Sequence, residues 1–165
     1  MKRPENPLHV VLVEPEIPQN TGNIARLCAA TGCTLHLVGK LGFSIDEKAV
    51  RRAGLDYWHL VTVKEHLDLA ACLTEIASPD LPLLFTTKST RNYLHAPYEA
   101  GSALVFGKET KGLPASIMAS YADRQYSIPT AVDSVRSLNL ANSVSIVLYE
   151  ALRATGALEH TVVAP

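Results

Sequence analysis

Six short runs of apolar and β-branched residues alternate with helical patterns along this chain of 165 residues. We expect strands at residues 9–13, 34–38, 59–63, 81–85, 103–106 and 125–128, and helices at about 21–31, 46–53, 64–77, 114–121 and 138–155. Strands that alternate with helices usually form a parallel sheet, because each helix returns the chain to the same end of the sheet. The alternation therefore predicts an α/β domain whose largely parallel sheet is covered on both faces.

The length favours a single domain. A chain of 165 residues can bury about two thirds of its unfolded surface, so it needs neither a disulfide nor a metal to fold. We expect a core from about residue 9 to residue 156. Cys28, Cys33 and Cys72 form no C-x-x-C pair and lie in apolar segments, so we interpret them as reduced core thiols.

The N-terminus and the charge set further limits. Residues 1–7 lack the apolar region of a signal peptide, and the longest apolar runs fall well short of the roughly 20 residues of a membrane span. We therefore expect a cytoplasmic protein that does not contact a membrane. The formal net charge of −1 gives no overall basic field for nucleic acid, so basic residues would bind it only where the fold gathers them. The candidates are Lys48, Arg51, Arg52, Lys88, Arg91, Lys108, Lys111 and Arg136.

Polar or glycine-bearing segments follow four of the expected strands, at residues 14–20, 86–90, 107–112 and 129–139. Open parallel sheets bind their ligands at the carboxyl ends of the strands, so we expect the functional site among these segments. The segment Gly107-Lys-Glu-Thr-Lys-Gly112 has the glycine spacing of a P-loop, but Leu113-Pro114 stands where that motif requires Lys and Ser or Thr. The sequence contains no G-x-G-x-x-G, H-E-x-x-H, G-x-S-x-G or clustered Cys and His pattern, which leaves nucleotide, metallohydrolase and serine-hydrolase chemistry without support.

The same residues also admit purely structural interpretations. Gly112 can relieve strain in a turn, and Pro114 can open the next helix. The first helix can begin with Asn20 or Thr21 as its N-cap and stop at Gly32. The last helix is apolar over much of its circumference, which indicates either deep burial or an interface. Taken alone, Ile128 and Leu138 fit a core, Ser137 fits a helix N-cap, and Arg26 fits an exposed position on an amphipathic helix.

Three segments resemble, in their order, the signature motifs of the SPOUT superfamily of RNA methyltransferases. They are Asn20-Thr-Gly-Asn-Ile-Ala-Arg26, Phe106-Gly-Lys-Glu-Thr-Lys-Gly-Leu-Pro114 and the stretch from Arg124 to Arg153. Residues 14–26, Arg51-Arg-Ala-Gly-Leu-Asp-Tyr57 and Thr86-Thr-Lys88 are most similar to the family of tRNA (cytidine/uridine-34-2′-O)-methyltransferases. The resemblance implies a single parallel-sheet SPOUT domain with a C-terminal deep trefoil knot and no accessory RNA-binding domain.

The resemblance also implies an activity and a cofactor. Members of the family transfer a methyl group from S-adenosylmethionine to the ribose 2′-oxygen of the wobble nucleotide of tRNA, C34 or U34, and need no metal. By resemblance, the cofactor would lie in the knot against Phe85, Thr86, Gly107, Ile128, Ser137 and Leu138.

Arg26 matches the essential arginine of the first motif, and Asn20 begins that motif. A guanidinium is always protonated in proteins, so we expect Arg26 to bind a phosphate of the target nucleotide and the developing 2′-oxyanion rather than to act as a base. Asn20 either caps the first helix or shapes the substrate side. The family forms homodimers through the first and last helices, so tRNA would be bound by the basic clusters of two subunits.

Two other functions remain open from the sequence. One is ribose 2′-O-methylation at another position of tRNA or rRNA, since the motifs describe the chemistry better than the RNA. The other is a non-catalytic RNA-binding protein that keeps the fold. Intact motif residues at positions 20, 26, 107, 109, 137 and 139 weigh against the second of these.

Overall fold

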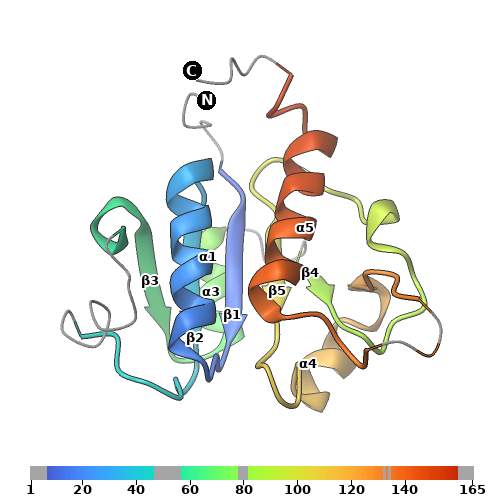
Figure 1. Ribbon diagram of the computed structural model, residues 1–165, viewed down its shortest axis with the longest axis horizontal. Helices are drawn as coiled ribbons and strands as arrows, with labels where there is room; N and C mark the ends of the chain where they lie inside the picture. Colours follow the sequence, from blue (N-terminus) through green and yellow to red (C-terminus); the bar gives the residue numbers. More distant parts are fainter. Residues whose placement is uncertain (1–6, 47–56, 78–81, 132, 134, 160–165) are drawn as a thin grey trace.

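The computed structural model describes residues 7–46, 57–77, 82–131, 133 and 135–159. Six strands form one sheet in the order β3-β2-β1-β5-β4-β6, and every neighbouring pair is parallel (Figure 1). This arrangement confirms the predicted parallel α/β sheet. The strands are β1 (His9–Val13), β2 (Thr34–Val38), β3 (Thr62–His66), β4 (Pro82–Phe85), β5 (Ala103–Phe106) and β6 (Gln125–Tyr126).

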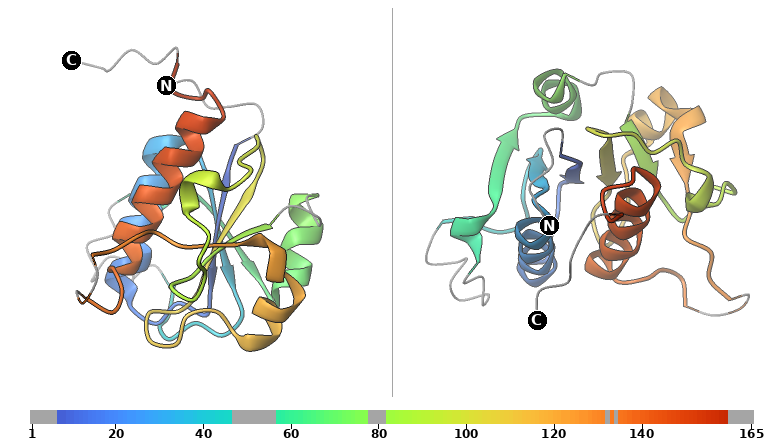
Figure 2. Two further views of the ribbon diagram at one scale, coloured as in Figure 1. Left: turned by 90° about the vertical axis from the view of Figure 1, so that its right-hand side faces the viewer. Right: turned by 90° about the horizontal axis from the view of Figure 1, so that it is seen from above.

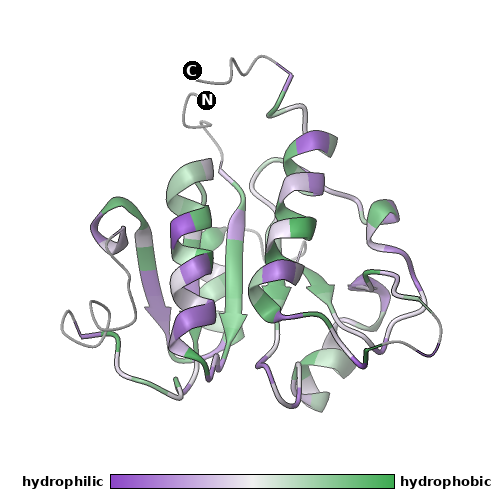
Figure 3. Ribbon diagram, in the orientation of Figure 1, coloured by the Kyte–Doolittle hydropathy of each residue, from purple (hydrophilic) through white to green (hydrophobic). Residues whose placement is uncertain are grey.

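Helices cover both faces of this sheet (Figure 2). Helices α1 (Pro18–Thr31) and α5 (Leu140–Ala154) lie on one face, and α3 (Leu69–Ile76) and α4 (Ala115–Ser120) lie on the other. Successive side chains of a strand point to opposite faces, so each face has its own apolar core. Leu12 of β1 packs in the α1 and α5 core, and its neighbours Val11 and Val13 pack in the α3 core. Most of β1 is accordingly hydrophobic in Figure 3.

Helix α1 begins earlier than its sequence pattern suggested. Its N-cap is Ile17, Pro18 occupies the first turn, and both Asn20 and Thr21 are buried inside the helix. The expectation that Asn20 or Thr21 would be the N-cap is therefore wrong, because proline at the first helical position fixes φ where no amide is needed. The predicted end is confirmed, since Gly32 adopts a left-handed conformation with φ of 70° and its amide donates to the carbonyl of Cys28.

The segment around β3 differs most from expectation. Residues 58–60 form a 3-10 helix, η1 (Trp58–Leu60), and the strand runs from Thr62 to His66 rather than over residues 59–63. The strand is an edge strand, with its polar side chains exposed, so its pattern is less apolar than a buried strand requires. Helix α3 then starts at Leu69, with Asp68 as its N-cap, and not at residue 64. The helix expected at residues 46–53 lies almost entirely outside the described residues.

Helix α5 has a buried face and an exposed face. Ala141, Val144, Val147, Leu148, Ala151 and Leu152 are buried against the sheet and α1, while Ile146 and Tyr149 remain 37% and 48% exposed. The N-cap of α5 is Asn139, whose side chain accepts hydrogen bonds from the amides of Ala141 and Asn142. The cap expected at Ser137 is wrong, because Ser137 lies outside the helix and is exposed.

All three cysteines are buried and free, as the sequence predicted. Strand β6 is shorter than expected and ends at Tyr126, and the chain then continues as a loop to α5. Within the described residues, no helix has the length and apolarity needed to cross a membrane.

Candidate active site

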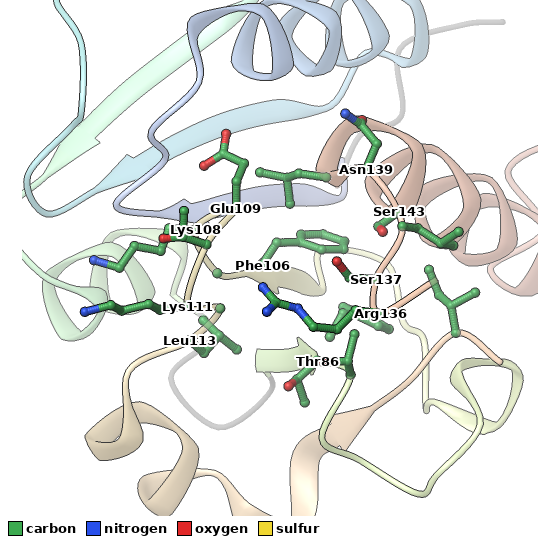
Figure 4. Close-up of a pocket in the computed structure, with 18 of the residues that line it drawn as sticks. Thr86, Phe106, Lys108, Glu109, Lys111, Leu113, Arg136, Ser137, Asn139 and Ser143 are labelled. Atoms are coloured by element: carbon green, nitrogen blue, oxygen red, sulfur yellow. The ribbon is translucent and has the colours of Figure 1, made fainter. Parts of the chain in front are cut away.

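A cavity of about 660 Å³ opens at the carboxyl ends of β4, β5 and β6 (Figure 4). This volume falls within the range of about 300–1,000 Å³ that small-molecule sites occupy. The lining comes from four segments that are far apart in the sequence. Residues 17 and 20 lie at the start of α1, residues 85–88 at the end of β4, and residues 106–113 at the end of β5. The fourth segment precedes and enters α5, and it contributes residues 127, 128, 130, 136–140 and 143.

The cavity brings together most of the residues that the sequence singled out. All six expected cofactor residues line it, as does Asn20, from the start of α1. Arg26 is not part of the lining. The expected site residues that line the cavity are Asn20, Phe85, Thr86, Gly107, Ile128, Ser137 and Leu138.

A carboxylate from the loop after β5 anchors the start of α1. Glu109 accepts a hydrogen bond of 2.8 Å from the amide of Glu16 and one of 3.0 Å from the amide of Ile17. It also accepts one of 3.2 Å from Nδ2 of Asn20. The described first turn of α1 contains no acidic residue of its own. Glu109 therefore supplies the negative charge that the positive end of the helix dipole favours.

Asn20 connects this hydrogen-bond network to α5. Its Oδ1 accepts a hydrogen bond of 3.0 Å from Nδ2 of Asn139, whose own Oδ1 caps α5. Because a carboxylate can only accept, Glu109 fixes the orientation of the Asn20 amide, and Asn20 in turn fixes that of Asn139. Three side chains thus join the loop after β5 to the beginnings of two helices, at the edge of the cavity.

The loop formed by residues 107–112, here called the Gly107 loop, turns back on itself at very short range. A Cβ atom on Gly107 would lie 2.1 Å from the carbonyl carbon of Gly112 and 2.2 Å from the amide nitrogen of Leu113. Only glycine fits such a backbone contact. Gly112 has a φ of 67°, which confirms the predicted relief of strain, but a Cβ there would meet nothing within 4 Å.

Further contacts hold the Gly107 loop against the segment between β1 and α1. Oε2 of Glu16 accepts hydrogen bonds from the hydroxyl of Thr110 at 2.8 Å and from its amide at 3.2 Å. The ammonium of Lys108 lies 3.6 Å from the carboxylate of Glu14. Each of the two loops thus supplies a carboxylate that accepts hydrogen bonds from the other loop, Glu109 from one side and Glu16 from the other. One wall of the cavity is therefore held in place before any ligand binds.

Part of the cavity lining is apolar and aromatic, and further aromatic surface packs against it. The rings of Phe85 and Phe106 stack with their centroids 5.2 Å apart, and the ring of Tyr126 lies 6.3 Å from that of Phe85. Ile128 and Leu138 add partly buried aliphatic surface. A ligand with a flat apolar part would find its complement here.

Cationic side chains gather around the mouth of the same cavity. Lys88, Lys108, Lys111 and Arg136 all contribute to its lining, although they come from three loops. In Figure 4 the Arg136 side chain extends from the segment before α5 toward the Gly107 loop. The net charge of the chain gave no sign of this cluster. The signal was local, since each of these residues follows a strand whose carboxyl end meets the others at one edge of the sheet.

Arg26 lies on the exposed side of α1, and it is not part of the cavity lining. Its guanidinium carbon stands 4.7 Å from the centroid of the Tyr57 ring, within the range of a cation–π contact. The contact restricts the long arginine side chain without neutralising its charge, and so leaves it able to bind an anion.

The chain matches a known protein family over residues 7–149, which is most of its length. It belongs to the SpoU rRNA methylase family. Among characterised relatives of this SpoU chain is the tRNA (cytidine(34)-2′-O)-methyltransferase of Escherichia coli K12, which is 50% identical over 150 residues, covering 90% of this chain and 94% of the relative.

Solved structures of the SpoU family share the fold. One of them concerns the 2-OH methylation of C/U34 on tRNA. It is 41% identical to this chain, superposes with a TM-score of 0.79, and covers 90% of this chain and 95% of the other. Another, the SpoU methyltransferase AviRb from Streptomyces viridochromogenes in complex with the cofactor AdoMet, is 25% identical with a TM-score of 0.75 and covers 92% of this chain and 61% of the other.

Proposed function

We propose that this protein transfers a methyl group from S-adenosylmethionine to the ribose 2′-oxygen of nucleotide 34 of tRNA. The observation that carries this conclusion is the 50% identity, over 90% of this chain and 94% of the relative, to a tRNA (cytidine(34)-2′-O)-methyltransferase. At this similarity the chemistry, the cofactor and the RNA position are all inherited together. The match extends over the loops that line the cavity as well as over the sheet.

S-adenosylmethionine occupies the cavity at the carboxyl ends of β4, β5 and β6. Its volume suits a molecule of this size, and Gly107 allows the loop that lines it to fold back on itself, because a Cβ there would collide with the backbone of Gly112 and Leu113. Ile128 and Leu138 contact the apolar part of the ligand, while Thr86 and Ser137 supply hydroxyls for its polar groups. When bound, the cofactor supplies an electrophilic sulfonium methyl group, and alignment with the 2′-hydroxyl provides much of the rate enhancement without a metal.

Arg26 and Asn20 act on the RNA side of the reaction. Arg26 stays protonated, so it binds a phosphate of the target nucleotide and favours the developing 2′-oxyanion. Since Arg26 is absent from the cavity lining of its own subunit, it serves the cavity of a partner. Asn20 is held by Glu109 and Asn139, and it shapes the cavity wall nearest α1.

The active form is a homodimer through α1 and α5. The two helices pack side by side, and α5 leaves Ile146 and Tyr149 exposed on its outer face. An apolar surface of this kind, beside the exposed Arg26 of α1, suits a two-fold contact that places each Arg26 near the other subunit's cofactor. The cationic rims of two cavities then lie within one tRNA footprint, which compensates for the net charge of −1.

The loop from β6 to α5 forms a deep trefoil knot by passing through the arch between β4 and β5. Three backbone hydrogen bonds support this path. Ser127 donates to the carbonyl of Arg91 and accepts from Tyr93, and Thr86 donates to Tyr126. The chain leaving β6 therefore runs within hydrogen-bonding distance of the arch. It then reaches α5, which lies on the face of the sheet opposite α4. The knot would enclose the cofactor between the arch, the Gly107 loop and the segment before α5.

Methyl transfer to a defined nucleotide tests the function directly. Purified protein is incubated with isotopically labelled S-adenosylmethionine and tRNA from a host that lacks the modification, and the label is mapped by digestion and mass spectrometry. A 2′-O-methyl group at nucleotide 34 is the expected result. Ribosomal RNA serves as the competing substrate, because the family description names rRNA. Label in rRNA alone would contradict the proposed substrate, and cofactor binding without transfer to either RNA would favour a non-catalytic protein.

A mixed dimer tests the placement of Arg26. Arg26→Ala and Gly107→Ala are each expected to be inactive alone. Mixed after mild dissociation, they form some dimers in which one subunit supplies Arg26 and the other an intact cavity. Activity is expected to return to about a quarter of the parent level, from half of the dimers with one of two sites working. No recovery, despite exchange shown by native mass spectrometry, would place Arg26 in its own subunit's reaction.

A further inference from the structure

Three histidine rings form a hydrogen-bonded row on the α3 face of the sheet, away from the cavity. Nδ1 of His9 lies 2.9 Å from Nε2 of His36, and Nδ1 of His36 lies 2.8 Å from Nε2 of His66. The three residues belong to β1, β2 and β3 in turn. Strand register pairs His36 with Val11, and His66 with Val38, both of which pack in the core beneath α3. The row therefore crosses three strands toward that helix.

A buried thiol and a carboxylate meet the row from α3. Cys72 is 0% exposed, and its Sγ and one ring nitrogen from each of His36 and His66 lie within 4.8 Å of one another. Glu75, further along the same helix, places Oε2 3.6 Å from Nδ1 of His66. None of these residues contributes to the lining of the cavity. The cluster thus has no part in the proposed methyl transfer.

We propose that His36, His66 and Cys72 bind a single Zn²⁺ ion, which ties β2 and β3 to α3. Two imidazoles and one thiolate are donors that Zn²⁺ prefers among physiological cations. Metal–nitrogen bonds of about 2.0–2.1 Å place two nitrogen ligands of a tetrahedral ion roughly 3.3 Å apart. The facing nitrogens of His36 and His66 are 2.8 Å apart and the ring centroids 5.1 Å apart, so the nitrogens point at each other and the rings must separate and turn to bind one ion.

The outward nitrogens of both rings already have the partners that a zinc ligand needs. Metal-binding imidazoles usually donate their second N–H to a carboxylate or another acceptor, which fixes the ring and its tautomer. Nδ1 of His66 faces the carboxylate of Glu75 at 3.6 Å. Nε2 of His36 faces Nδ1 of His9 at 2.9 Å. His9 and Glu75 therefore act as positioning residues for the two imidazole ligands.

The buried position of His36 favours the neutral form that binds metal. Burial, followed by repulsion from His9, His66 and Lys64, lowers the pKa of His36 to about 3, so this ring is neutral at physiological pH. Lys64 lies on the same face, and its ammonium forms an ion pair with Glu75. That pair balances the charge of Lys64.

The thiol is the group that must lose a proton. Burial, followed by repulsion from Glu75, raises the pKa of Cys72 to about 12, so the metal-free site carries an S–H bond. On binding, that S–H bond breaks, a Zn–S bond forms, and the proton passes to solvent. The proton between His36 and His66 moves to Nε2 of His36, and His9 changes tautomer to accept it. One proton is released for each ion bound.

Cobalt substitution tests the site on the intact, metal-stripped protein. Titration with Co²⁺ is expected to saturate at one equivalent, with sulfur-to-cobalt charge-transfer absorption that Zn²⁺ abolishes. Cys72→Ser should remove this absorption. The matched control is Cys33→Ser, which changes another buried thiol, on the opposite face, and should leave the absorption intact. His66→Gln should weaken binding at least tenfold, because it removes one ligand.

X-ray absorption on the zinc-loaded parent protein decides the matter even if a variant fails to fold. One sulfur at about 2.3 Å with nitrogen scatterers at about 2.0–2.1 Å is expected. Lack of stoichiometric binding, a shell of oxygen atoms alone, or charge-transfer absorption that survives Cys72→Ser would each overturn the proposal. Neither measurement involves S-adenosylmethionine or RNA, so the outcome is independent of the proposed methyl transfer.

Discussion

Nδ2 of Asn139 donates a hydrogen bond of 3.0 Å to Oδ1 of Asn20, although 119 residues of chain separate them. Through this bond the first turn of α1 and the N-cap of α5 are joined at one cavity wall. Oδ1 of Asn139 caps α5, and Nδ2 of Asn20 donates a hydrogen bond to Glu109. A change at any of the three residues should therefore affect the cavity as well as a helix end.

Asn20→Asp is expected to destabilise the protein by about 1–3 kcal/mol at pH 7, because it replaces a donor with a carboxylate facing Glu109. Two facing carboxylates raise the pKa of one of them, so the folded variant binds a proton more readily than the unfolded chain. The loss in free energy of unfolding should be complete at neutral pH and should become smaller as the pH falls toward 4. Urea denaturation across this range measures the change.

Asn23→Asp is the control for Asn20→Asp, since it places the same charge on an exposed position of the same helix. It should change the free energy of unfolding by no more than about 0.5 kcal/mol. Equal losses in the two variants would show that the network around Glu109 is not the cause.

Gly107→Ala is expected to weaken S-adenosylmethionine binding at least tenfold, because its Cβ would lie 2.1 Å from the backbone of Gly112 and force the loop to open. Gly112→Ala is the matched substitution in the same loop. Its Cβ meets nothing within 4 Å, so only the φ of 67° is unfavourable, at about 1 kcal/mol. Calorimetric titration compares the two variants, and equal cofactor affinities would place the cofactor elsewhere.

Arg26→Ala is expected to lower the rate of methyl transfer by about 10²–10³-fold while leaving the affinity for S-adenosylmethionine within twofold. The reason is that Arg26 lies outside the cavity lining and keeps its charge available beside Tyr57. Single-turnover kinetics and cofactor titration separate the two effects. Arg26→Lys, which keeps the charge but loses the planar guanidinium, should recover only part of the rate. Parallel loss of rate and cofactor affinity would contradict a role on the RNA side.

Ile146→Asp is expected to give folded monomers that bind S-adenosylmethionine but do not methylate tRNA. Ile146 is 37% exposed on the outer face of α5, so an added charge there disturbs a subunit contact rather than the core. Val144→Asp provides the contrast, since Val144 is 0% exposed and a buried charge should prevent folding. Analytical ultracentrifugation and circular dichroism distinguish these results. An active dimer of Ile146→Asp would move the interface away from this face.

Hydrophobic pattern predicted the sheet well where strands are buried and poorly where they are not. β1, β2 and β5 have the expected bounds, since both of their faces contact a core. The predicted bounds of β3 were displaced toward the apolar Leu60 and Val61. An edge strand exposes polar side chains, so its sequence pattern resembles that of an exposed helix. The true helix start was marked by Asp68, whose side chain accepts from the amide of Ala71.

The cavity lies where the sequence predicted a site, but the hydrogen bonds that connect its walls were not predicted. The rule that ligands bind at the carboxyl ends of parallel strands selected the loops that line the cavity. Glu109 was recognised as a motif residue, but its bonds to amides of Glu16 and Ile17 depend on how two loops fold together. His36, His66 and Cys72 follow no metal-binding spacing, and only the register of β2 and β3 beneath α3 brings them together.

The carboxylate that accepts hydrogen bonds at the start of α1 belongs to Glu109, which has not yet been synthesised when the residues of α1 leave the ribosome. Ile17 emerges from the ribosome 92 residues before Glu109, which accepts its amide hydrogen. Synthesis at about 5–20 residues per second leaves that end of the helix without its anion for several seconds. A nascent chain halted before residue 109 should therefore show rapid amide exchange at the start of α1, with protection gained only once the second half of the sheet has been translated and joined to the first.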